Sequence, residues 1–280
     1  MNTSALTQIQ KLAFIGAGNM ATALISGLHG RGMPGSRIVA ADPNPEALRR
    51  LAEEFGIQRA DNAAAVREAS VVILAIKPQL MRAAALQLAP HLAHPKPLII
   101  SVAAGIPHAA LAGWLGPQVV IIRTMPNRPA LHGCGATGLF APPSVGVEQR
   151  DLAQTIMSAV GAAVWVREES QLDTVTALSG SGPAYFFLLM EALEAAAVAR
   201  GLPADIAHQL TLETAYGAAH MARHATEPLS TLREQVTSKG GTTAAALQIF
   251  EAAGFRDIVA NAVAAADRRS AELAAQYAIP

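Results

Sequence analysis

The sequence is poor in cysteine, in aromatic side chains and in charge. Its single cysteine, Cys134, excludes an internal disulfide and fits a reducing compartment. Aromatic residues make up 4% and charged residues 15% of the 280 residues, and the formal net charge is zero. Because no basic stretch stands out, nucleic acid and anionic membrane surfaces are poor candidates as partners.

Targeting and membrane signals are also missing. Residues 1–8 contain no basic region followed by an apolar block, so they do not resemble a signal peptide. The most apolar run, residues 183–190, is interrupted by Glu191 and Glu194, well short of a span of about 20 residues. We therefore expect a soluble cytoplasmic protein.

What the chain has in quantity is apolar residues, 51% of the total, which is enough for a substantial core. In the first half, short apolar runs alternate with helical patterns, which indicates a doubly wound parallel sheet over residues 11–168. The expected strands and apolar runs are residues 11–15, 37–41, 71–76, 97–105, 119–124, 137–140 and 163–166, and the expected helices include 22–29, 45–54 and 147–160.

A glycine turn joins the first expected strand to the first helix. Gly16, Gly18 and Ala21 form the pattern G-x-G-x-x-A between these two elements, which is the context that a dinucleotide fingerprint requires. Gly16 permits the tight turn, Gly18 lets a pyrophosphate approach the backbone, and Ala21 allows close packing of helix on strand. The turn predicts a bound dinucleotide.

Asp42 follows the second expected strand, about twenty residues past the glycine turn, where the acidic residue of the fingerprint is found. A carboxylate there accepts hydrogen bonds from the adenosine ribose hydroxyls and repels the 2′-phosphate of NADP. The alternative is an Asx turn ahead of the helix at 45–54. On the first interpretation Asp42 favours NADH.

Residues 169–280 lack strand signals and predict an all-helical domain. Its expected helices are residues 170–178, 184–200, 204–223, 230–236, 244–253 and 255–277. The helix over 184–199 is apolar on nearly every face, so it must be buried all round. So small a domain can hardly surround it alone, and we predict an intertwined homodimer, with a helix central to one monomeric bundle as the alternative. Three histidines here lack a neighbouring carboxylate or cysteine set, so we expect no metal site.

A second glycine loop, residues 236–243, opens the helix at 244–253. Consecutive N–H groups at a helix N-terminus form an anion site, and Thr242 or Thr243 can cap the helix or donate a hydroxyl. The alternative is an ordinary helix start after a glycine turn.

Taken together, these motifs resemble the pyrroline-5-carboxylate reductases over residues 11–275. The resemblance rests on FIGAGNMA (14–21), AIKP (75–78), SVAAG (101–105), MPN (125–127), LSGSGPAY (178–185) and VTSKGGTT (236–243). It implies NAD(P)H-dependent reduction of 1-pyrroline-5-carboxylate to L-proline, the last step of proline biosynthesis. It also implies a Rossmann domain, a helical dimerisation domain, and dimers that often assemble further into decamers of five dimers.

The resemblance assigns roles to residues. It implies a substrate site in which backbone groups of the second glycine loop meet the carboxylate and the Thr243 hydroxyl lies near the ring nitrogen as the catalytic group. The implied substrate-binding residues are Ser179, Ser238, Gly240, Gly241, Thr242 and Thr243. The implied cofactor-binding residues, together with Asp42, are Gly16, Ala17, Gly18, Asn19, Met20, Asn62, Ala75, Ile76, Lys77, Pro78, Val102, Ala103, Ala104 and Asn127.

The sequence departs from the family pattern at four positions. Lys239 stands where proline is common, Arg128 replaces the threonine of Met-Pro-Asn-Thr-Pro, and Ala21 takes the third glycine position. Asp42 puts the frequent NADPH preference of the family in question.

Two other functions remain as alternatives. A β-hydroxyacid dehydrogenase would need a catalytic lysine on the helix at 184–199, which has none. A non-catalytic dinucleotide sensor would have no use for the second glycine loop. Reduction of a protonated cyclic imine, by contrast, needs orientation more than acid–base groups.

Overall fold

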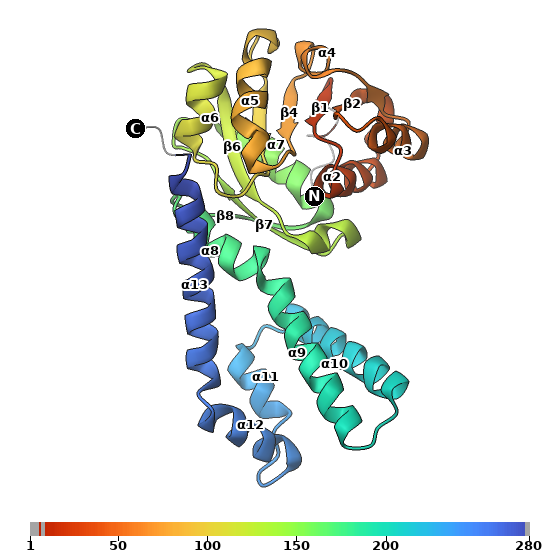
Figure 1. Cartoon of the computed structure of the whole chain (residues 1–280), viewed down its shortest axis with the longest axis vertical. Helices are drawn as coiled ribbons and strands as arrows, with labels where there is room; N and C mark the ends of the chain where they lie inside the picture. Colours follow the sequence, from red (N-terminus) through yellow and green to blue (C-terminus); the bar gives the residue numbers. More distant parts are fainter. Residues whose placement is uncertain (1–5, 7–8, 278–280) are drawn as a thin grey trace. The chain divides into compact units, whose positions relative to one another are not determined.

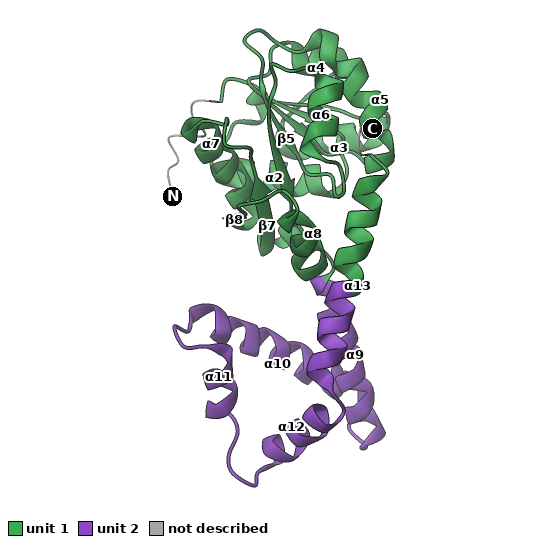
Figure 2. Cartoon of the chain, turned by 90° about the vertical axis from the view of Figure 1, so that its left-hand side faces the viewer, with its two compact units in different colours: residues 1–181, 265–280 green, residues 182–264 purple. Residues whose placement is uncertain are grey.

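The computed structural model describes Leu6 and residues 9–277. The expectation about a signal peptide in residues 1–8 therefore lies, apart from Leu6, outside the described residues. Contacts divide the chain into two compact units, one of residues 1–181 and 265–280 and the other of residues 182–264 (Figure 2).

An eight-stranded sheet forms the centre of the first unit, with the order β3-β2-β1-β4-β5-β6-β7-β8. β1 to β6 are parallel, whereas β7 runs antiparallel to β6, and β8 runs parallel to β7. The expected Rossmann-like sheet is therefore confirmed, and the reversal at one edge is a feature that the sequence did not reveal. The strands are β1 (Leu12–Ile15), β2 (Ile38–Ala41), β3 (Gln58–Arg59), β4 (Val71–Leu74), β5 (Leu98–Ser101), β6 (Val120–Met125), β7 (Gly135–Phe140) and β8 (Gly161–Trp165).

Helices cover both faces of this sheet (Figure 1). One apolar cluster contains side chains of α2, α3 and α7, and the other contains side chains of α4, α5 and α6. Every residue of β1, β2, β4 and β5 is buried, as expected for parallel strands covered on both sides. The α-helices are α2 (Asn19–Gly30), α3 (Pro45–Phe55), α4 (Asn62–Arg67), α5 (Pro78–Leu88), α6 (His108–Leu115) and α7 (Val147–Met157). Short 3-10 turns are η1 (Gly35–Arg37), η2 (Ala89–His91), η3 (Arg128–His132) and η4 (Ser158–Val160).

The first unit also includes α8 (Gln171–Val175), a π-helical turn η5 (Thr176–Gly180) and the C-terminal part of α13 (Phe255–Ala275). The Thr174 hydroxyl donates to Asp267 at 2.8 Å, and the Ser270 hydroxyl donates to Asp173 at 2.6 Å. These bonds join segments far apart in the sequence. For this reason the boundary between the two compact units falls after residue 181, although the strand signals of the sequence end before residue 169.

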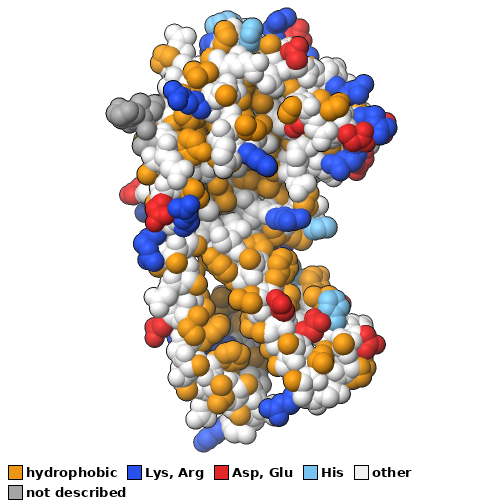
Figure 3. All heavy atoms as spheres, viewed as in Figure 1, with side chains coloured by type: hydrophobic (Ala, Val, Ile, Leu, Met, Phe, Trp, Pro, Cys, Tyr) orange, Lys and Arg blue, Asp and Glu red, His pale blue; other side chains and the backbone are white. Residues whose placement is uncertain are grey.

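The second unit consists of α9 (Gly182–Ala199), α10 (Ala204–His224), α11 (Leu229–Gln235), α12 (Thr242–Ala252) and the N-terminal part of α13. The apolar helix α9 is not buried by its own chain. Phe186, Phe187 and Leu188 are 64%, 65% and 67% exposed, and hydrophobic side chains gather over α9 and α10 (Figure 3). The alternative of a helix central to one monomeric bundle is therefore wrong.

The stretch Gln171–Ala199 is long and apolar enough to cross a membrane by length and composition, and 6% of it is buried. The expectation that Glu191 and Glu194 leave it well short of a span was wrong on that ground, because two charges are compatible with a span of this length. An apolar helix face left open by its own chain is also what a dimer interface requires.

Candidate active site

The first glycine turn has the geometry of an anion site. Gly16 has φ +103°, and a side chain there would overlap the carbonyl oxygen of Ala75. Around Gly18, by contrast, a Cβ would meet nothing within 4 Å. Gly18 is the N-cap of α2 and supplies no side chain to its first turn, so the N–H groups there are open to a ligand. The turn therefore fits a dinucleotide pyrophosphate.

Asp42 is tied to this turn. Its Oδ2 accepts a hydrogen bond from the Ala17 N–H at 2.7 Å, and its Oδ1 accepts one from the Asn44 N–H at 2.8 Å. The Asx turn is therefore present, and the same carboxylate also lines the cavity beside the turn. The two interpretations of Asp42 thus do not exclude each other.

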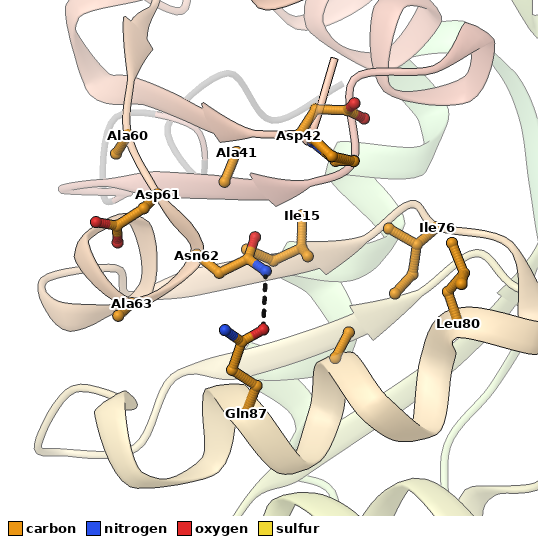
Figure 4. Close-up of a pocket in the computed structure, with 13 residues that line it drawn as sticks. Ile15, Ala41, Asp42, Ala60, Asp61, Asn62, Ala63, Ile76, Leu80 and Gln87 are labelled. Carbon is orange, nitrogen blue, oxygen red and sulfur yellow. Dashed lines mark hydrogen bonds between the residues drawn. The ribbon is translucent and has the colours of Figure 1, made fainter. Parts of the chain in front are cut away.

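That cavity has a volume of about 630 Å³ and lies at the carboxyl ends of β1 and β2 (Figure 4). Apolar side chains from β1, the loop after β4 and α5 form part of its wall, namely Ile15, Ile76, Leu80 and Ala84. Its polar lining comes from Asp42, Asp61, Asn62 and Gln87. The Asn62 amide donates to Gln87 Oε1 at 3.4 Å. An apolar slot with a few polar groups suits an adenosine, so the residues fit the predicted cofactor.

Sequence reasoning missed the α5 wall of this cavity. Leu80, Ala84 and Gln87 recur at helical spacing after Lys77 and Pro78, so they share one face of α5. The signal was present in the sequence, because residues spaced by four and three positions after Pro78 share one face of the helix that follows β4.

The two other loops assigned to the cofactor leave β4, which is next to β1, and β5, which is next to β4. The Ala75 N–H donates to Ile15 O at 2.8 Å, and the Val102 N–H donates to Leu74 O at 3.2 Å. The ladder thus continues past β4 and β5 and fixes where each loop begins. Lys77 caps α5 and is exposed, whereas Ala103 is buried. Residues 75–78 and 102–104 therefore lie at the ligand-binding edge of a parallel sheet.

Asn127 is 8% exposed, and its side chain is committed to two protein contacts. Its Nδ2 donates to Ser179 O at 2.9 Å, and its Oδ1 accepts from the Ala136 N–H at 2.8 Å. The Ser179 hydroxyl in turn donates to Val175 O at 2.9 Å. In this structure the amide of Asn127 holds the π-helical turn against β7, and its expected contact with the cofactor stays a prediction. Arg128, next to it, is exposed.

The second glycine loop opens α12 in the other unit. Gly240 has φ +72°, and α12 begins at Thr242 with Gly241 as its N-cap. Capping by Thr242 or Thr243 is therefore wrong, because both lie inside the helix. The Gly241 N–H donates to Ser238 O at 3.0 Å, so it is less available to a ligand than expected. The N–H groups of Thr242 and Thr243 have no partner within the helix.

A charged cluster joins the helices on either side of this loop. Arg256 donates to Glu251 at 2.9 Å, and Arg233 lies 3.9 Å from the same carboxylate. The hydrogen bond from Arg256 lowers the pKa of Glu251. The cluster links α11, α12 and the start of α13. Lys239 is exposed, and no ion pair of Lys239 occurs among the residues that the structure describes.

A partly buried ion pair that the sequence did not reveal lies at the start of α6. Arg123 Nη1 is 2.6 Å from Glu169 Oε1, and the same oxygen accepts from the His108 N–H at 2.5 Å. Arg123 is 7% exposed. Burial lowers the pKa of the His108 side chain, and Arg123 lowers it further, against the opposing effect of Glu169. Glu169 thus fixes the start of α6 and with it the end of the loop before that helix.

Comparison with known proteins agrees with this arrangement. The family model described as pyrroline-5-carboxylate reductase dimerisation matches residues 169–273, and that of the F420-dependent NADP oxidoreductases matches residues 11–105. A pyrroline-5-carboxylate reductase of Pseudomonas aeruginosa is 50% identical over 267 residues, 95% of this chain and 97% of that protein. One of Vibrio alginolyticus is 44% identical over 94% of this chain and 97% of its own.

Solved structures extend the likeness to three dimensions. A pyrroline-5-carboxylate reductase of Coxiella burnetii is 40% identical, with a TM-score of 0.91 over 94% of this chain and 98% of that one. A pyrroline carboxylate reductase of Plasmodium falciparum with NADP bound is 28% identical, with a TM-score of 0.83 over 95% and 98%. Full-length identity of this degree, together with the two glycine turns, shows that this chain belongs to the pyrroline-5-carboxylate reductase family.

Proposed function

We propose that this protein reduces 1-pyrroline-5-carboxylate to L-proline with NADH or NADPH, the last step of proline biosynthesis. The observation that carries the proposal is the 50% identity to a pyrroline-5-carboxylate reductase across 95% of the chain. The match includes both glycine turns. The comparisons give no support to a β-hydroxyacid dehydrogenase or to a non-catalytic sensor.

The first unit would hold the cofactor, which supplies a hydride when bound. Residues 16–20 would surround the pyrophosphate at the start of α2. The N–H groups of residues 18–20 would bind it, because the first N–H groups of a helix have no partner within it, whereas those of Gly16 and Ala17 already donate to Ala41 O and Asp42. Asp42 and Asn62 would meet the adenosine in the cavity that they line. Residues 75–78, residues 102–104 and Asn127 would border the rest of the cofactor.

The second glycine loop would hold the substrate. The N–H groups of Gly240 and Thr242, with that of Gly241 after it releases Ser238, would bind the carboxylate at the N-terminus of α12, where the helix dipole favours an anion. The Ser238 and Ser179 hydroxyls would complete the polar contacts. The Thr243 hydroxyl would donate to or accept from the ring nitrogen and so orient C5 of the ring.

This division of labour suits the reaction. A protonated cyclic imine is already an electrophile, so the protein has to position the ring rather than supply a strong acid. Among the described residues, the loop itself contains no histidine or carboxylate. Orientation by the loop and the turn would therefore provide most of the acceleration.

The protein carries the dimerisation domain of its family, and a homodimer would cover the apolar face of α9. We further propose assembly of five dimers into a decamer, a cytoplasmic location, and no partnership with nucleic acid or membrane. The domain boundary that we propose is residue 168, with residues 169–280 for dimerisation and substrate binding.

The test is an activity assay with the purified chain. NADH and NADPH are each mixed with 1-pyrroline-5-carboxylate, the loss of absorbance of the reduced nicotinamide is followed, and proline is identified by mass spectrometry. Matched oxidation and proline formation with at least one cofactor supports the proposal. Failure with both cofactors, in a protein that still binds them, would overturn it.

A further inference from the structure

The cavity beside the glycine turn is acidic. Its charged lining consists of Asp42 and Asp61, and none of the described residues that line it is a lysine or an arginine. Asp61 is the N-cap of α4, where its Oδ1 accepts from the Ala64 N–H at 2.7 Å. Asp42 is thus the carboxylate of this cavity that also contacts the glycine turn.

Two backbone donors hold the Asp42 carboxylate in place. Ala17 binds one oxygen at 2.7 Å, and Asn44 binds the other at 2.8 Å. A carboxylate held at both oxygens cannot swing out of the cavity without losing two charge-assisted hydrogen bonds. Each oxygen keeps a second lone pair, so a vicinal diol can still donate to it.

The two arginines of α3 do not line this cavity. Arg49 is 2.6 Å from Glu46 and 3.2 Å from Glu53 on its own helix. Arg50 lines a neighbouring cavity of about 330 Å³, which also includes Ala17 and Asn44, the two residues whose N–H groups bind Asp42. A 2′-phosphate would therefore enter a cavity that offers it carboxylates and no cation.

We infer that this protein prefers NADH and that Asp42 determines the preference. The inference rests on the proposed function and names which of its two cofactors the site takes. The ribose 2′-hydroxyl of NADH donates to Asp42, whereas the 2′-phosphate of NADPH brings about two negative charges to an acceptor that cannot turn away. Discrimination of this kind depends on repulsion of the wrong ligand as much as on attraction of the right one.

Binding measured by calorimetry tests the inference without turnover. NADH and NADPH are titrated separately into the wild-type chain and into Asp42→Asn, Asp42→Ser, Arg50→Ala and Glu54→Gln. Asp42→Asn keeps the shape and removes the charge. Glu54→Gln removes a charge from an exposed position of α3 that does not line the cavity. It therefore controls for the electrostatic effect of losing any one negative charge nearby. Circular dichroism verifies that each variant is folded.

We expect the wild type to bind NADH at least about tenfold more tightly than NADPH, and both Asp42 variants to reduce that ratio by about tenfold or more. Glu54→Gln and Arg50→Ala should leave the ratio within about twofold of the wild type. A wild type that prefers NADPH, or Asp42 variants with an unchanged ratio, would overturn the inference. Preference for NADPH that disappears in Arg50→Ala would assign the 2′-phosphate to Arg50 instead.

The kinetic ratio with 1-pyrroline-5-carboxylate gives a second measure. Turnover with a higher kcat/KM for NADPH would refute the inference and leave the proposed reductase intact. Tight NADH binding without turnover by either cofactor would support Asp42 and refute the proposed reductase. The two claims therefore fail separately.

Discussion

The side-chain amide of Asn127 donates to the carbonyl oxygen of Ser179 at 2.9 Å, and so joins two motifs that lie 52 residues apart. The same amide accepts from Ala136. One nearly buried side chain thus fixes the loop after β6, the start of β7 and the π-helical turn. Its position near the proposed cofactor site makes Asn127 a positioning residue.

Asn127→Ala should lower the free energy of unfolding by about 1–3 kcal/mol, because it leaves buried polar backbone groups without a partner. It should also lower kcat/KM. Asn127→Asp keeps the acceptor for the Ala136 N–H and loses the donor to Ser179 O. Its free energy of unfolding should therefore lie between those of the wild type and Asn127→Ala. Urea unfolding checks the prediction. Wild-type stability in both variants would mean that Asn127 has no structural role.

Gly16 and Gly18 should respond differently to alanine. At Gly16 a side chain meets the Ala75 carbonyl with the backbone at positive φ, so Gly16→Ala should destabilise the protein by about 1–3 kcal/mol or more. Gly18→Ala has room in the protein alone but fills the space proposed for the pyrophosphate. Gly18→Ala should have the free energy of unfolding of the wild type, but its affinity for the cofactor should be lower by about tenfold or more. Equal cofactor affinity in Gly18→Ala would contradict the assignment of the turn.

Thr243→Ala should lower kcat/KM by about tenfold to a thousandfold, because the proposed hydrogen bond to the ring nitrogen is lost. Thr243→Ser keeps the hydroxyl and should restore most of the activity. Thr242→Ala, at the exposed neighbouring position, serves as the matched control and should be nearly silent. Steady-state kinetics with saturating cofactor make the comparison. Wild-type rates in Thr243→Ala would remove Thr243 from the mechanism.

Stability should depend on pH through His108. Burial lowers its pKa below the ordinary value of about 6.5, so the unfolded chain binds a proton that the folded protein does not. This contribution is complete above about pH 6.5 and is lost as the pH falls towards the folded-state pKa. Between pH 7.5 and 5, Tm should therefore fall further in the wild type than in His108→Gln. If Tm falls equally with pH in the wild type and in His108→Gln, His108 does not contribute to the pH dependence of stability.

The open face of α9 should control assembly. Leu188→Glu places a charge on a side chain that is 67% exposed in the single chain, where we expect the partner to cover it. Sedimentation velocity should then show a species of 29.0 kDa instead of a dimer. Leu86→Glu makes the same change at an exposed position of α5 in the other unit and should leave the dimer intact. A dimer that survives Leu188→Glu would place the interface elsewhere.

The features that the sequence predicted correctly are local. The strand before Gly16 and the helix after Gly18 follow from apolar patterning and from the glycine positions, because each depends on a few neighbouring residues. The distance of Asp42 from the turn in sequence placed it beside that turn, as the structure has it, and its contact with the ribose stays a prediction. The apolar composition of α9 likewise indicated a helix that its own chain does not cover.

The features that it missed depend on contacts between distant segments. The reversal of β7 follows from its pairing with β6 and leaves no pattern in either strand. The pair of Arg123 and Glu169 joins a strand to a turn 46 residues later. The hydrogen bond from Thr174 to Asp267 spans 93 residues and draws part of α13 into the first unit. No window of sequence contains both members of such a pair.

The most direct test of the proposed reaction follows the hydride itself. NADH and NADPH in which both hydrogens at C4 of the nicotinamide ring are deuterium are each incubated with the protein and 1-pyrroline-5-carboxylate, and the proline formed is analysed by nuclear magnetic resonance. We expect one deuterium at C5 of proline with at least one of the two cofactors. Proline without the label, or no proline at all, would contradict it.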